Sequence, residues 1–187
     1  ALSSGIRFFD TAEVYGQGKS EDLLGKFIRE SGQEVIVATK FMPFPWRLSR
    51  RSLVRALKKS IHRLGLEKVS LYQIHSPLPP ITIETWMDAL SEAVLNGLTS
   101  AVGVSNFDMD QMMRSYDSLV HRGIRLSSNQ VEYNLLNRSI EFSGMLERCC
   151  ELGVVLIAYS PLALGLLSGK YTPENPPQGI RGSRINK

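Results

Sequence analysis

Four residues with complementary proton chemistry stand at or just beyond the ends of short apolar runs. Asp10 and, five residues later, Tyr15 follow the first run, Lys40 follows the second, and His75 follows the third. A tyrosine phenol has a pKa near ~10, and a neighbouring ammonium makes its proton easier to release. We therefore expect Lys40 to lower the pKa of Tyr15, Asp10 to hold Lys40 charged and oriented, and His75 to hydrogen-bond a substrate carbonyl.

Together these side chains suit a reaction in which a hydride reaches a carbonyl carbon while Tyr15 protonates the oxygen. Each residue also has a purely structural interpretation. Asp10 could cap a helix, Tyr15 could be a packed loop aromatic, Lys40 could be solvated, and His75 could be a structural histidine with satisfied hydrogen bonds. The chemical interpretation therefore depends on all four residues lying on one rim of the fold.

Six short apolar runs recur along the chain, and their first residues are 25 to 34 residues apart. This spacing matches a strand–helix unit of roughly 30 residues. Two of the runs are continuous rather than alternating, which is typical of parallel strands buried on both faces. The predicted strands are Ile6–Phe9, Val35–Ala38, Val69–Ile74, Ala101–Val104, Leu126–Val131 and Val154–Ala158.

Helical patterns with capping residues fill the intervals between these runs. A Ser, Thr or Asp side chain at the start accepts a hydrogen bond from an unpaired amide, and a glycine at the end adopts the left-handed conformation. The predicted helices are one capped by Ser20 and ending at Ser31–Gly32, one opened by Ser49 or Ser52 and ended by Gly65, Thr82–Asn96, one from Asp108 to Gly123, and one from about Ser139 to Glu151.

Repeated strand–helix units form either an open doubly wound sheet or a closed barrel. Gly16-Gln17-Gly18 lacks the third glycine of a dinucleotide-binding G-x-G-x-x-G loop, and the sequence has no P-loop pattern. We therefore predict an α/β fold of the (β/α)8 TIM-barrel type. Eight units need about 250 residues, so 187 residues predict a partial barrel with about strands 2 to 7. We expect residues 1–187 to form one domain truncated at both ends, with a loop-rich tail at 172–187.

Composition is that of an ordinary globular protein and excludes a disordered tail, a collagen-like repeat and a disulfide scaffold. The net charge is +4, and residues 47–68 carry eight Lys and Arg side chains against Glu67 alone. We interpret this segment as the solvated face of an amphipathic helix rather than a nucleic-acid site, because no aromatic residues interleave with the cations. Cys149 and Cys150 are adjacent and unsuited to a mutual disulfide, which favours a reducing compartment.

Two further classes of site have no support in the sequence. No apolar run approaches the roughly 20 residues that span a bilayer, and no His, Cys and carboxylate set has metal-ligand spacing. We expect a cytoplasmic protein, or a plastid protein if a transit peptide precedes Ala1. We predict no membrane, nucleic-acid or metal partner and make no prediction of an oligomeric state.

Segments at the strand ends resemble the aldo-keto reductase family. They follow one another in the order and spacing of that family over essentially the whole chain. The matching segments are Phe9–Gly16, Val37–Lys40, Leu71–His75, Gly103–Phe107, Gln130–Asn134 and Ala158–Leu162. Residues Gly165–Tyr171 resemble the branch that includes plant reductases and potassium-channel β subunits.

The resemblance implies a (β/α)8 barrel and NADPH-dependent reduction of aldehydes or ketones to alcohols, with Tyr15 as the proton donor and Asp10, Lys40 and His75 completing a tetrad. It also implies a set of cofactor contacts. Ser105, Asn106 and Gln130 would bind the nicotinamide carboxamide, Tyr159 would stack on the ring, and Ser160, Leu162, Gly165, Lys170 and Arg181 would lie along the phosphates.

Two alternatives stay open on the sequence alone. The chain could be a cofactor-binding regulatory subunit of the channel β-subunit type, although the intact tetrad favours an enzyme. It could also be an inactive fragment, because an unclosed barrel exposes strand edges. The loops Phe41–Trp46 and Pro77–Ile81 follow Lys40 and His75, and we expect them to line the substrate pocket as an apolar wall.

Overall fold

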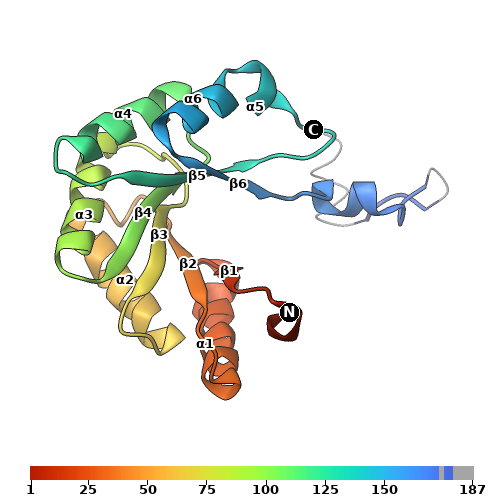
Figure 1. Cartoon of the computed structure of the whole chain (residues 1–187), viewed down its shortest axis with the longest axis horizontal. Coiled ribbons are helices and arrows are strands. Elements are labelled where there is room, and N and C mark those ends of the chain that lie inside the picture. The colour runs from red at the N-terminus through yellow and green to blue at the C-terminus, as the bar shows by residue number, and fades with distance from the viewer. Residues whose placement is uncertain (173–174, 179–187) are drawn as a thin grey trace.

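The computed structural model describes residues 1–172 and 175–178. Six parallel strands form one sheet in which each strand pairs with the next along the chain. The sheet curls into a half-barrel (Figure 1), which confirms the predicted partial TIM-barrel architecture. The strands are β1 (Phe8–Asp10), β2 (Ile36–Phe41), β3 (Val69–Ile74), β4 (Thr99–Ser105), β5 (Leu126–Glu132) and β6 (Val155–Tyr159).

Helices connect successive strands and lie along the outer side of the curled sheet (Figure 1). Three short 3₁₀ segments precede β1, follow β1 and follow β6. The helices are α1 (Lys19–Ser31), α2 (Arg50–Leu64), α3 (Ile83–Leu95), α4 (Met109–Val120), α5 (Ser139–Phe142) and α6 (Met145–Leu152), and the 3₁₀ segments are η1 (Leu2–Ser4), η2 (Tyr15–Gly18) and η3 (Ala163–Ser168).

Capping residues named from the sequence begin three of the helices. The Ser49 hydroxyl accepts from the Ser52 amide in a reciprocal capping box at the start of α2, and Gly65 ends that helix in the left-handed conformation. Asp108 caps α4 with a second capping box, and the Thr82 hydroxyl caps α3 by accepting from the Thr85 amide. Each cap satisfies amides that have no partner within the helix, so these boundaries follow from local chemistry.

The expected cap of α1 is wrong. Gly18, at φ 95°, is the N-cap, and no side chain caps this helix. The Ser20 hydroxyl lies inside the first turn and is 2.8 Å from the Thr11 hydroxyl. Ser20 therefore joins the helix to the residue that follows β1, instead of closing the helix end.

Two predictions near the C-terminal end of the sheet are also corrected. The single helix expected from about Ser139 to Glu151 is divided into α5 and α6, because Gly144 adopts φ 74°, outside the right-handed helical region. The continuous apolar run of β6 predicts burial on both faces, yet Val155 is 61% exposed. β6 pairs with β5 on one side, and no described strand pairs with its other side.

The core fills the layer between the sheet and the outer helices. The apolar positions predicted for α2 face this layer, with Leu53, Leu57 and Leu64 fully buried. Trp86 of α3 packs against Phe41 at the end of β2, with ring centroids 5.2 Å apart. Burial of these large side chains supplies the main stabilisation of the fold and fixes the positions of the strand ends.

The parallel register brings the carboxyl ends of all six strands to one rim. Backbone hydrogen bonds continue past the strands, from Thr11 N to Ala38 O at 2.9 Å and from His75 N to Phe41 O at 2.8 Å. Polar residues that follow neighbouring strands therefore become neighbours in space. Among the described residues, no helix has the length and apolar character needed to cross a bilayer.

Candidate active site

A buried ion pair joins the ends of β1 and β2. The Lys40 ammonium is fully buried and donates to Asp10 Oδ2 at 2.5 Å and to the Thr11 carbonyl at 2.9 Å. Burial lowers the pKa of Lys40, while the Asp10 charge and hydrogen bond oppose this shift. The contact expected between Asp10 and Lys40 is present, and the Thr11 carbonyl is an acceptor that the sequence did not reveal.

Tyr15 lies beside this pair at the start of η2. The Lys40 ammonium is 5.4 Å from the centre of the Tyr15 ring, and Tyr15 is 43% exposed. Burial, the Asp10 carboxylate and Tyr159 together raise the pKa of Tyr15 above its ordinary value. The net lowering of this pKa expected from Lys40 is not found: burial and the negative charge of Asp10 are the two largest causes of the shift, and both raise the pKa.

His75 completes the group from the end of β3. Its ring meets the Tyr15 ring edge to face, with centroids 5.8 Å apart and planes at 84°. Burial lowers the pKa of His75, and the Lys40 charge lowers it further, whereas Asp10 opposes the shift. His75 is therefore neutral at pH 7 and retains one ring N–H that can donate a hydrogen bond.

Eight of the thirteen predicted catalytic and cofactor residues line one polar cleft of about 430 Å³ at the strand rim. Three tetrad residues and five predicted cofactor residues line it, while Lys40 lies buried behind its wall. The lining residues are Asp10, Tyr15, His75, Ser105, Asn106, Gln130, Tyr159 and Ser160.

Asn106 is the central hydrogen-bonding residue of this cleft. Its amide donates to the His75 carbonyl at 3.0 Å and to Ser105 Oγ at 3.2 Å, and its oxygen accepts from the Tyr159 hydroxyl at 2.8 Å. Asn106 has φ 60° and Ser160 has φ 52°, a region that few non-glycine residues adopt and that clusters at functional sites. These hydrogen bonds connect Ser105, Asn106 and Tyr159, which were predicted to contact the cofactor, to His75 of the predicted tetrad.

The other described residues that were predicted to lie along the cofactor phosphates do not line this cleft. Leu162 and Gly165 belong to the turns around η3, where Gly165 has φ 99°, and Lys170 is exposed with its ammonium 5.8 Å from the Tyr171 ring. Arg181 lies outside the described residues, as does most of the predicted 172–187 tail.

The loops expected to form an apolar wall do not line the cleft either. Phe41 is buried under Trp86, and Phe44 and Trp46 face a separate pocket beside α2. Sequence reasoning also missed a clamp beside Tyr15, in which Glu13 accepts two hydrogen bonds from Arg47, at 2.6 and 3.1 Å, and one from the Met42 amide. The opposite charges of Glu13 and Arg47 could have suggested this pair, but the two residues are 34 positions apart in the sequence.

Neither a metal centre nor a disulfide is formed by the residues that the structure describes. No cluster of three His, Cys, Asp or Glu residues suited to a metal ion occurs within 1–172 and 175–178. Cys149 is buried and Cys150 is exposed, and both are free thiols.

Comparison with known proteins places these motifs in a family. The sequence model of the Aldo/keto reductase family matches residues 1–186. The chloroplastic pyridoxal reductase of Arabidopsis thaliana is 42% identical over 97% of this chain and 53% of its own length. The probable voltage-gated potassium channel subunit beta of Oryza sativa subsp. japonica is 31% identical over 95% of this chain and 57% of its own length.

A solved relative supports the same assignment. The aldo/keto reductase from Klebsiella pneumoniae in complex with NADP and acetate superposes with a TM-score of 0.77 at 29% identity, over 90% of this chain and 58% of that one. The chain thus spans little more than half the length of these relatives. The matched family, the shared fold and the motifs at the strand ends agree, and the chain belongs to the aldo/keto reductase family.

Proposed function

We propose that this chain carries the catalytic side of an NADPH-dependent oxidoreductase that reduces aldehyde or ketone carbonyls to alcohols. The observation that carries the proposal is the shared cleft, which Asp10, Tyr15 and His75 line together with Ser105, Asn106 and Gln130. A proton donor and polar partners for a carboxamide therefore face the same space. Bound NADPH would supply the hydride, and with it both electrons, to the carbonyl carbon.

The residues of the cleft fit such a cofactor. A nicotinamide ring needs a flat contact and partners for its carboxamide, which Tyr159 and the side chains of Ser105, Asn106 and Gln130 offer. Beyond β6, Leu164 and Gly165 adopt positive φ angles, a geometry in which successive amides can turn toward an anion. We expect Ser160, Leu162, Gly165, Lys170 and Arg181 to lie along the phosphates, as the family resemblance implies.

Tyr15 is the proton donor in this proposal. Because its pKa is raised, the phenol holds its proton at neutral pH and has one to give. When the proton passes to the carbonyl oxygen, a phenolate develops next to the Lys40 ammonium, which Asp10 keeps charged. The Lys40 ammonium would thus stabilise charge that exists only as the reaction proceeds, which is the kind of interaction that lowers a barrier.

His75 orients the substrate. Since its pKa is lowered and it lines the cleft, it offers a neutral N–H to the carbonyl oxygen without competing with Tyr15 as an acid. A hydrogen bond from His75 and the proton from Tyr15 would then converge on one oxygen. This arrangement fixes the carbonyl for hydride transfer to its carbon.

The test is NADPH oxidation, followed by the loss of its near-ultraviolet absorbance, with pyridoxal and with a simple aromatic aldehyde as substrates. Pyridoxal is chosen because the Arabidopsis relative is named for its reduction. Removal of a general acid costs about 10²–10⁴-fold in turnover, so Tyr15→Phe should lose at least about a hundredfold. Tyr116→Phe on α4, which also removes one phenol, should keep normal turnover, and normal turnover in Tyr15→Phe would refute the assignment.

A cofactor-binding regulatory subunit is the second candidate, and the rice relative favours it. Such a protein would bind NADPH without appreciable turnover. NADPH binding by fluorescence together with absence of oxidation for every aldehyde tested would select this candidate. Failure to bind NADPH would count against both.

A further inference from the structure

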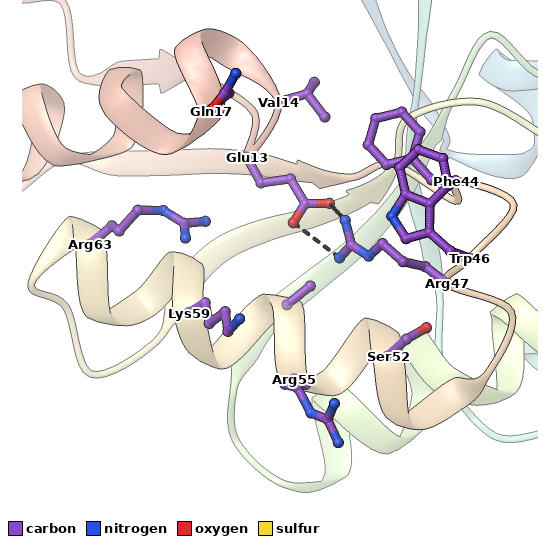
Figure 2. Close-up of a pocket in the computed structure, with 11 residues that line it drawn as sticks. Glu13, Val14, Gln17, Phe44, Trp46, Arg47, Ser52, Arg55, Lys59 and Arg63 are labelled. Carbon is purple, nitrogen blue, oxygen red and sulfur yellow. Dashed lines mark hydrogen bonds and ion pairs between the residues drawn. The ribbon is translucent and has the colours of Figure 1, made fainter.

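A second pocket lies outside the catalytic cleft, between the segment around Tyr15, the loop that follows β2, and α2 (Figure 2). Its volume is about 570 Å³, within the range of small-molecule sites. It shares no lining residue with the catalytic cleft. A ligand bound here would therefore be neither the cofactor nor the carbonyl substrate of the proposed function.

The charges around this pocket are unbalanced. Four cations and one carboxylate line it. Arg47 is held by Glu13, and Arg63 donates to the buried Glu21 at 2.7 Å. Arg55 and Lys59 are exposed and form no ion pair with any residue in the described part of the chain. Two positive charges thus face the pocket without compensation.

No acidic residue of α2 compensates these positive charges. Lys59 follows Arg55 by four residues and Arg63 follows Lys59 by four, so the three cations form one row on α2. Like charges at this spacing destabilise a helix. No Asp or Glu occurs among the fifteen residues of α2. An anion seated between Arg55 and Lys59 would turn this repulsion into attraction.

The wall formed by the β2–α2 loop is aromatic. The rings of Phe44 and Trp46 stack with centroids 4.8 Å apart and planes within 8° of parallel. Trp46 is nevertheless 76% exposed, which is unusual for a tryptophan. Both rings line the same pocket as the α2 cations, and Figure 2 shows the Arg47 side chain between the ring pair and α2. A planar ligand could stack on Trp46 while its charged group reaches α2.

We propose that this pocket binds a small aromatic compound that carries a phosphate group, with the ring against Trp46 and the phosphate between Arg55 and Lys59. A phosphate monoester carries close to two negative charges at neutral pH, which matches the two uncompensated cations. A carboxylate would neutralise only one of them. The Arg47–Glu13 pair forms part of the same wall and holds its shape without competing for the ligand.

Calorimetric titration of the purified protein with phenyl phosphate tests the proposal directly. The titration is done without NADPH or aldehyde, so its outcome is independent of the proposed activity. Phenol and inorganic phosphate serve as the two halves of the probe and should each bind more weakly than phenyl phosphate. Binding should weaken as salt is added, because the two cations are exposed.

Two charge-matched double variants locate the site. Arg55→Gln with Lys59→Gln removes the two pocket cations and should weaken phenyl phosphate binding by about tenfold or more. Arg51→Gln with Lys58→Gln removes two exposed cations of the same helix that do not line the pocket, and should change affinity by no more than about twofold. Trp46→Ala should weaken phenyl phosphate but leave inorganic phosphate unchanged.

Several outcomes would overturn the proposal. Equal losses in the two double variants would show attraction to the overall charge of α2 rather than to a site. If phenyl phosphate binds no better than inorganic phosphate, the proposed contact between an aromatic ring and Trp46 is refuted. Absence of binding at millimolar concentration, with thermal unfolding showing a folded protein, would exclude the site altogether.

Discussion

The Lys40 ammonium is fully buried, whereas its partner, the Asp10 carboxylate 2.5 Å away, is 28% exposed. The two halves of this pair therefore depend on each other unequally. Asp10 keeps access to water if Lys40 is removed. Lys40 keeps only the Thr11 carbonyl if the charge of Asp10 is removed, and a buried charge without a counter-charge is costly.

We therefore expect Asp10→Asn to destabilise the protein more than Lys40→Met at pH 7. Removing one partner of a buried pair costs about 3–5 kcal/mol, and Asp10→Asn should approach the lower end of this range because Lys40 can lose its proton. Lys40→Met should cost clearly less. Urea unfolding of both variants measures the difference, and the reverse order would show that the ammonium is better solvated than its position indicates.

The cost of Asp10→Asn should shrink as the pH rises. Burial lowers the pKa of Lys40, so above that pKa and up to about 10.4 the unfolded chain binds more protons than the folded one, and stability rises with pH. The Asp10→Asn substitution removes the interactions that raise this pKa, so the rise begins at lower pH in the variant. Unfolding at a neutral and at an alkaline pH should show the gap closing, and a constant gap would exclude Lys40 as the titrating group.

The pKa of His75 should shift in opposite directions when its two charged neighbours, Lys40 and Asp10, are replaced. Burial and then Lys40 lower its pKa, and Asp10 raises it. Lys40→Met should therefore raise the His75 pKa, and Asp10→Asn should lower it further. Proton NMR of the His75 ring, assigned with His75→Gln, measures both shifts, and shifts in the same direction would contradict the arrangement.

The same lowered pKa has a consequence for stability in acid. Between the folded pKa of His75 and about 6.5, the unfolded chain binds the extra proton, so the free energy of unfolding falls as the pH drops through this window. His75→Gln should lose this part of the slope. Chemical unfolding at several mildly acidic pH values measures the slope, and an identical slope in the variant would place the titration elsewhere.

The buried carboxylate of Glu21 on α1 leads to a further prediction. Glu21 is fully buried and accepts from Thr39 Oγ1 at 2.6 Å and from Arg63 Nε at 2.7 Å, whereas Arg63 is 22% exposed. Arg63→Met should cost about 3–5 kcal/mol, because it leaves the carboxylate buried without its cation. Glu21→Met should cost less, and the double variant should recover much of the loss. Additive losses in this cycle would show that the pair contributes no coupling.

Much of the site could be predicted because strand ends and helix caps are local features. The runs that end in Asp10, Lys40 and His75 and the caps Ser49, Thr82 and Asp108 all need only neighbouring residues to be recognised. The sequential order of the parallel strands then brings distant strand ends together. For this reason the residues that line the cleft are among those predicted from the sequence, whereas the predicted loops 41–46 and 77–81 and residues Leu162, Gly165 and Lys170 do not line it.

Features that depend on burial or on long-range contacts could not be predicted. The pKa of Tyr15 is raised by partial burial and by the Asp10 carboxylate beside it, which residue types alone do not reveal. The Glu13–Arg47 clamp joins residues 34 positions apart, and the stack of Phe44 on Trp46 depends on a loop conformation. The broken helix at Gly144 reflects one backbone angle that overrides an otherwise helical pattern.

Two substitutions at Asn106 distinguish the effect of its backbone conformation from the effect of its side-chain hydrogen bonds. At φ 60°, alanine is disfavoured by about 1–2 kcal/mol relative to glycine, while neither residue can replace the bonds to the His75 carbonyl, Ser105 and Tyr159. Asn106→Ala should therefore unfold at a lower temperature than Asn106→Gly. Both variants should lose NADPH affinity to a similar extent, measured by fluorescence titration, because both lack the same amide. Tight NADPH binding by Asn106→Gly would show that the backbone turn, rather than the amide side chain, serves the cofactor.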